Sequence, residues 1–212
     1  GIVAGAKNGR SFLERQIARE LNRAAAYTGN DTCVELVVPF GNAYDDRLVA
    51  IVSMEPGATD RLILRLPPDD RTPSYVEVRV PSGGPELPPF EIGLRGPAPS
   101  DTLPPEPLSE GSTRNLPGLA GRLYHVPARS VGTAGDPATS DAYIVMAFAP
   151  SAATVDGDIL ARPGAWEIEL VNPGSEPLEI VLQIQRDDSP YPRQTGARQA
   201  YFDSAEAHQF DP

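Results

Sequence analysis

The sequence of 212 residues has very little cysteine, histidine or lysine. The one cysteine, Cys33, excludes an internal disulfide framework and a cysteine-based zinc site, and it is expected to be an inert, buried thiol. The two histidines, His125 and His208, lie far apart and belong to no motif, so neither is assigned a role. No apolar run approaches the ~20 residues that span a bilayer, so no membrane span is expected.

Acidic residues outnumber basic ones by 29 to 18, which gives a formal net charge of −11. A chain this acidic repels phosphate backbones, so nucleic acid is not expected as a partner. The 24 prolines are about twice the usual share of ~5%. Because each interior proline removes a helix hydrogen bond, this composition excludes a helical bundle or a coiled coil.

One helix is predicted over residues 10–27. Ser11 and Glu14 form a capping box at its start, and Thr28-Gly29-Asn30 ends it. A strand is predicted over residues 34–38, before Pro39. The order of helix and strand predicts a small α/β fragment over residues 1–50. The apolar residues that recur at helical spacing are Leu13, Ile17, Leu21 and Ala24.

From about residue 47 onward, short segments of alternating apolar and polar residues lie between proline and glycine turns. Such alternation places one face of a strand in a core and the other in water. About eight or nine such strands predict a mainly β fold, an antiparallel β-sandwich or jelly roll over residues 51–212. Residues 96–120 are predicted to be one long loop, and the tail 187–212 is predicted to wrap back over another surface. The expected strands cover 48–54, 62–66, 76–80, 90–94, 123–126, 143–148, 166–170 and 178–184.

The segment 37–42, Val-Val-Pro-Phe-Gly-Asn, follows the capped helix and resembles the subtilisin-like serine peptidases. In that family a helix precedes a buried strand that ends in a small residue and then Gly-Asn. The resemblance implies that Asn42 is the oxyanion-hole donor and that Gly41 allows the backbone to turn. It also implies that Gly1 lies near the strand edge that pairs with the substrate backbone. The alternative for Gly41-Asn42 is a simple turn after a strand.

Residues 60–81 and 164–203 are similar to a β insertion of some bacterial members of the family, placed between the oxyanion asparagine and the nucleophilic serine. The family's Gly-Thr-Ser and His-Gly-Thr motifs are absent from this sequence, no aspartate motif can be placed, and Phe40 stands where the family usually has alanine. The resemblance therefore implies an internal segment of a peptidase, inactive alone. Its partners would be the remaining catalytic domain and, through it, a polypeptide substrate. A start at Gly1 without methionine agrees with a cut segment, and the family suggests secretion or a periplasmic location.

A different class of protein has the same composition and alternation: a stand-alone β-sandwich module that binds carbohydrate or protein. In such a module Trp166 would be an exposed platform for a sugar ring. Its alternation with Ile168 and Leu170 predicts a core position instead.

Two acidic pairs precede proline, Asp69-Asp70 and Asp187-Asp188. Calcium is one interpretation, because hard oxygen ligands cluster in this way. Turn chemistry is favoured, since aspartate side chains accept hydrogen bonds from nearby backbone amides. The segment 156–158, Asp-Gly-Asp, is interpreted as a tight turn for the same reason. No cofactor is therefore expected, and Ca²⁺ is kept as the weaker alternative.

Overall fold

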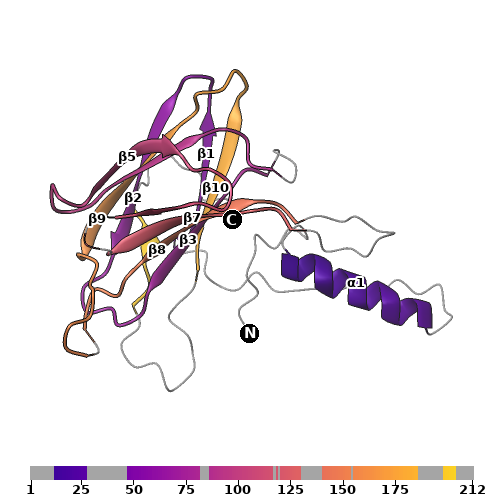
Figure 1. Ribbon diagram of the computed structural model, residues 1–212, viewed down its shortest axis with the longest axis horizontal. Helices are drawn as coiled ribbons and strands as arrows, with labels where there is room; N and C mark the ends of the chain where they lie inside the picture. Colours follow the sequence, from indigo (N-terminus) through magenta and orange to yellow (C-terminus); the bar gives the residue numbers. More distant parts are fainter. Residues whose placement is uncertain are drawn as a thin grey trace.

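The computed structural model describes residues 12–27, 47–81, 86–116, 118, 120–129, 140–153, 155–185 and 198–203. Helix α1 (Phe12–Tyr27) agrees with the helix predicted over 10–27, and it stands apart from both sheets in Figure 1. The strand predicted over 34–38 lies outside the described residues, as do Cys33, His208 and the second acidic pair.

Two antiparallel sheets form a β-sandwich (Figure 1), which confirms the predicted mainly β fold class. Sheet A has the strand order β1-β10-β3-β8-β7-β6, and sheet B has the order β11-β2-β9-β4-β5. The strands are β1 (Val49–Met54), β2 (Thr59–Leu66), β3 (Ser74–Arg79), β4 (Glu91–Arg95), β5 (Thr102–Pro107), β6 (Thr113–Asn115), β7 (Gly121–Val126), β8 (Tyr143–Phe148), β9 (Gly164–Val171), β10 (Leu178–Ile184) and β11 (Tyr201–Phe202).

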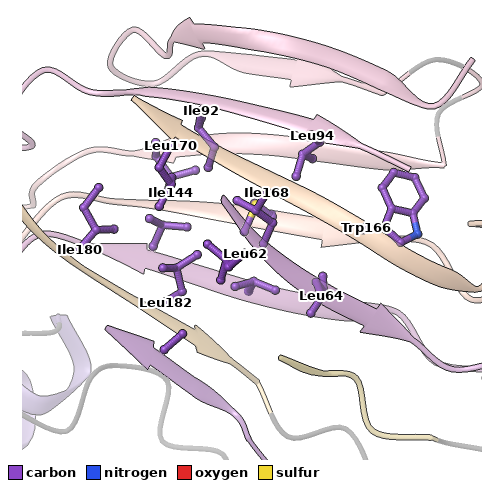
Figure 2. Packing of buried hydrophobic residues seen from close by; sticks show 14 of the residues in the cluster. Leu62, Leu64, Ile92, Leu94, Ile144, Trp166, Ile168, Leu170, Ile180 and Leu182 are labelled. Carbon is purple, nitrogen blue, oxygen red and sulfur yellow. The ribbon is translucent and has the colours of Figure 1, made fainter. Parts of the chain in front are cut away.

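The hydrophobic core lies between the two sheets and takes every second residue of the long strands, as the alternation predicts. Trp166 is fully buried on β9 (Figure 2), and its ring meets Phe148 edge to face, with 5.2 Å between ring centroids. The predicted core position of Trp166 is confirmed, so its ring is not a sugar platform. Other fully buried side chains of this core are Leu62, Leu64, Ile92, Leu123, Met146, Ile168, Leu170 and Ile180.

Strands from opposite ends of the chain pair with each other. Strand β1 pairs with β10, and β2 pairs with β9, each along its whole length. The short β11 pairs with the other side of β2, so residues 201–202 form an edge strand of sheet B. This pairing places the first and the last described strands at the same side of the sandwich.

Residues 96–120 contain two strands, so the prediction of one long loop is wrong. Strand β5 carries Pro104, Pro105 and Pro107, residues that ordinarily indicate a loop. Proline lacks an N–H group and is accepted in a strand at a sheet edge, and β5 is an edge strand of sheet B. The pairing of β4 with β5 shifts between Ile92 and Leu94, where a Cβ on Gly93 would lie only 2.8 Å from the Pro105 nitrogen. Glycine at position 93 is what lets the proline strand approach so closely.

Candidate functional site

The three residues predicted to form a peptidase site, Gly1, Gly41 and Asn42, lie outside the described residues. Their roles therefore stay predictions from the sequence. The described residues instead define four polar arrangements on the sandwich.

The first arrangement joins the two ends of the sandwich. The Phe202 amide donates to the Arg47 carbonyl at 3.0 Å, and an Arg47 guanidinium nitrogen lies 3.7 Å from an Asp203 carboxylate oxygen. The other oxygen of Asp203 accepts a hydrogen bond from Arg65 Nε at 2.6 Å. Arg47 precedes β1, and Asp203 follows β11. The two ends of the described sandwich therefore meet at one point, which we call the junction (Arg47 and Asp203).

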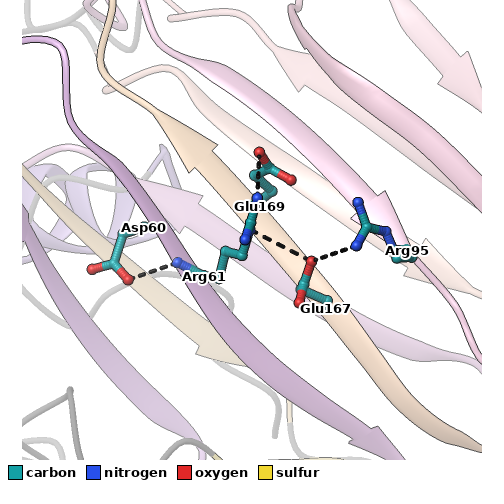
Figure 3. A network of polar contacts seen from close by, with 5 residues as sticks. All are labelled: Asp60, Arg61, Arg95, Glu167 and Glu169. Atoms are coloured by element: carbon teal, nitrogen blue, oxygen red, sulfur yellow. Dashed lines mark hydrogen bonds and ion pairs between the residues drawn. The ribbon is translucent and has the colours of Figure 1, made fainter.

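The second arrangement is a row of charges across the outer face of sheet B (Figure 3). Arg61 on β2 lies 3.6 Å from Glu167 and 3.4 Å from Glu169, both on β9, and Arg95 on β4 lies 3.5 Å from Glu167. The Glu169 hydrogen bond, with the charges of both glutamates, raises the pKa of the Arg61 guanidinium. The side chains of Arg61 and Arg95 are more than half exposed, so water screens these ion pairs and they add little to stability. Glu167 and Glu169 are only 25% and 18% exposed, so the row is open to water at its arginines, and it does not place a reactive group.

A hollow of about 160 Å³ lies beside that row, between β4, β5 and β9. Typical small-molecule pockets measure about 300–1,000 Å³, so this hollow has room for a few waters or one small group. Its lining residues are Leu94, Arg95, Thr102, Leu103, Pro104, Pro105 and Glu169.

The third arrangement is built on Asp70 of the first acidic pair. Asp70 Oδ1 accepts hydrogen bonds from the Thr72 amide at 3.0 Å, the Thr72 hydroxyl at 2.7 Å and the Arg198 amide at 3.1 Å. The Asp70 backbone amide donates a hydrogen bond to Ser151 Oγ at 2.9 Å. The buried carboxylate thus joins its own turn to the returning tail, and the Asp70 backbone joins that turn to the loop at Ser151. This is the turn chemistry that the sequence analysis favoured.

Replacing Asp70 with alanine is expected to lower the free energy of unfolding by about 2–4 kcal/mol, because buried donors lose a charged acceptor. Denaturant titration of the chain measures this loss. The matched control is Asp69→Asn, since Asp69 is exposed at a φ of 60°, a conformation that asparagine also adopts. The control should change stability by less than about 0.5 kcal/mol. Equal stability of the two variants would contradict the proposed role of Asp70.

The fourth arrangement is the turn at 156–158, where the Val155 amide donates to Asp158 Oδ2 at 3.0 Å and Gly157 has a φ of 89°. This is the tight turn that the sequence predicts.

His125, to which the sequence assigns no role, lies within hydrogen-bond distance of the backbone: its Nδ1 is 2.8 Å from the Leu108 carbonyl oxygen. Within the described ranges, no group of three or more histidine, cysteine, aspartate or glutamate side chains could hold a metal ion.

The described helix is too short and too polar to cross a membrane.

The junction was not predictable from the sequence, because Arg47 and Asp203 stand at opposite ends of the sandwich sequence. The only signal would have been their opposite charges flanking the first and the last strand, and many other pairs in this chain share that property.

No family model matches this sequence, and no curated protein matches it. Among solved structures, the chain is similar to the CspB protease of Clostridium perfringens, with a TM-score of 0.57 and 15% sequence identity. The similarity covers 86% of this chain but 33% of that one, so this chain spans about a third of the length of the protease. At this identity the likeness shows a shared fold.

Proposed function

We propose that this chain is an internal segment of a subtilisin-like serine endopeptidase. Residues 1–50 would belong to its α/β catalytic layer, and residues 51–212 would form a β-sandwich inserted into that layer. Two independent observations support the proposal: the subtilase-like segment that ends in Gly41-Asn42, and the structural similarity of most of this chain to a third of a protease.

The observation that carries the proposal is the junction. A domain inserted into another must leave its host and return to it at nearly the same place, so its two ends lie close together. The backbone hydrogen bond from Phe202 to Arg47 joins the two ends of this sandwich directly, and the Arg47–Asp203 ion pair adds to it.

In this proposal the reaction is acyl transfer from a peptide to a serine and then to water. Asn42 donates a side-chain hydrogen bond to the oxyanion that develops on the substrate carbonyl, and Gly41 allows the turn that directs it. Gly1 belongs to the edge that pairs with the substrate backbone. The nucleophile, its histidine and its aspartate are supplied by the rest of the enzyme, and the chemistry calls on no cofactor.

A fluorophosphonate probe, which modifies activated serines, tests the proposal. The full-length protein is expected to be labelled and to cleave an unfolded polypeptide such as casein. The 212-residue chain is expected to do neither, because it has no triad motif. A full-length protein that is folded but neither labelled nor active would favour the binding-module alternative. Specific cleavage by the 212-residue chain would also contradict the proposal.

A further inference from the structure

The connection between β8 and β9 is a surface loop that is fixed at its base. The Ala161 amide donates to the Pro150 carbonyl at 2.9 Å, so the two ends of residues 150–161 lie side by side. The Ala152 amide donates to the Asp70 carbonyl at 2.8 Å, which ties the same base to the turn after β2. A surface loop whose ends meet in this way is an Ω-loop, a class that frequently carries a function. We call residues 150–161 the Ω-loop.

The tip of the Ω-loop is held far less firmly than its base. The Val155 amide donates to Asp158 Oδ2 at 3.0 Å, and the return bond from the Asp158 amide to the Val155 carbonyl is long, at 3.4 Å. Asp156 and Gly157 lie between these residues and are exposed. Within the described ranges, neither the Asp156 carboxylate nor the Gly157 amide takes part in a hydrogen bond. The two groups are therefore positioned by the local backbone alone.

The order of these two residues matters chemically. A backbone amide nitrogen can attack the side-chain carboxyl carbon of the aspartate that precedes it, because the ring that forms is five-membered. A Cβ on the attacking residue crowds this approach, and glycine has none. A Cβ built on Gly157 would meet nothing within 4 Å, so no neighbouring group blocks its surroundings either. The other described aspartates all precede a residue with a side chain; they are Asp60, Asp69, Asp70, Asp101, Asp141, Asp158 and Asp203.

We propose that Asp156 is a site of spontaneous isomerisation to isoaspartate in the folded protein. The Gly157 nitrogen forms a bond to Cγ of the Asp156 carboxylic acid, the bond from Cγ to the hydroxyl oxygen breaks, and the amide proton leaves with that oxygen as water. Water then adds to one of the two carbonyl carbons of the resulting succinimide. Opening at Cγ restores aspartate, and opening at the backbone carbonyl gives isoaspartate. The water lost is regained, so the mass is unchanged and no co-reactant is needed.

The product alters the tip of the Ω-loop and spares its base. In isoaspartate the main chain runs through Cβ and Cγ, which adds one methylene to the backbone and leaves the α-carboxylate as a side branch. The Val155–Asp158 hydrogen bond spans this linkage and is expected to be lost. The exposed apolar side chains on either side of it, Val155 and Ile159, then change their relative positions. The bonds at Ala161 and Ala152 lie outside the altered turn, so the sandwich is expected to stay folded.

Endoproteinase Asp-N, which cuts before aspartate but not before isoaspartate, tests the proposal. The full-length protein is treated with a fluorophosphonate to prevent self-cleavage. It is then kept for several weeks at neutral pH, either native or in denaturant, before unfolding, digestion and mass spectrometry of the peptides. Cleavage before residue 156 is expected to be lost in the native sample at a rate within about tenfold of that in denaturant, because the tip needs little opening to react.

Two comparisons make this result specific. Cleavage before Asp158 should persist, because the next residue is the β-branched Ile159 and the Asp158 carboxylate is bonded to the Val155 amide. Gly157→Asn adds a Cβ to a residue with a φ of 89°, a sign of φ that asparagine accepts more readily than most residues. This variant is expected to keep most of its cleavage before residue 156.

Three outcomes would overturn the proposal. Loss of cleavage in denaturant but not in the native protein would show that the folded tip holds Asp156 away from the reactive geometry. Equal loss before residues 156 and 158 would indicate general damage instead of a site. Equal loss in Gly157→Asn and the unaltered protein would show that the absence of a side chain at 157 is not what permits the reaction. None of these outcomes depends on whether the protein is a peptidase.

Discussion

Replacing Asn42 with alanine in the full-length protein is expected to lower kcat for peptide hydrolysis about 10²–10³-fold, with little change in KM. This range is the one known for loss of the oxyanion donor in a subtilisin-like enzyme and corresponds to about 2.7–4 kcal/mol of transition-state stabilisation. The effect falls on kcat because the donor contacts charge that exists only in the transition state. Steady-state kinetics on a peptide ester or amide measure it.

The control for this prediction is Asn115→Ala, which removes an exposed asparagine side chain from β6 and should leave kcat unchanged. Asn42→Asp tests the direction of the hydrogen bond, because an ionised carboxylate accepts but does not donate. It is expected to reduce kcat at least as much as alanine does. A wild-type rate in Asn42→Ala would remove this residue from the site and favour the simple-turn interpretation of Gly41-Asn42.

The sandwich was predictable because its core follows a local rule. Val76 and Val78 on β3 lie on either side of Glu77, and Leu178 and Ile180 on β10 lie on either side of Glu179. All four apolar side chains are buried. The rule needs only the period of a strand, so it fixes which side of each strand is inward without knowledge of its partner.

The prediction from sequence failed for segments whose structure depends on strands that are far away in the sequence. Strand β5 contains three prolines and forms only because it lies at a sheet edge, and no local pattern indicates which strand will be at an edge. Strand β11 is two residues long and owes its place to β2, far away in the sequence. The tail around it therefore had no period to detect.

In the candidate site, too, contacts between sequence neighbours were predictable and contacts between distant residues were not. The turn role of Asp70 was predictable from its neighbours, since Thr72 is two residues away, but its bond to the Arg198 amide was not. The junction between Arg47 and Asp203 required the folded chain. Asn42 was assigned from family resemblance, and its test is the kinetic experiment above.

The second large effect is expected in the core. Replacing Trp166 with alanine should lower the free energy of unfolding by about 3–5 kcal/mol, because it deletes the largest buried side chain and leaves a cavity. The ring meets Phe148 edge to face, and its Nε1 donates to the Arg162 carbonyl at 2.9 Å. It also packs so closely over Gly96 that a Cβ there would lie 2.8 Å from two ring carbons. Few neighbouring groups can therefore move in to fill the space.

Two variants separate the contributions of volume and hydrogen bonding. Trp166→Phe keeps an aromatic ring against Phe148 but removes the donor to Arg162, so its loss of stability should lie between wild type and Trp166→Ala. Tyr201→Ala removes a half-exposed aromatic ring from the outer face of β11 and should cost less than about 1 kcal/mol. Because Trp166 is the only tryptophan, unfolding is followed by far-ultraviolet circular dichroism in denaturant instead of by fluorescence. If Trp166→Ala and Tyr201→Ala cost the same, the ring does not sit between the sheets, and the order of strands around β9 would have to be different.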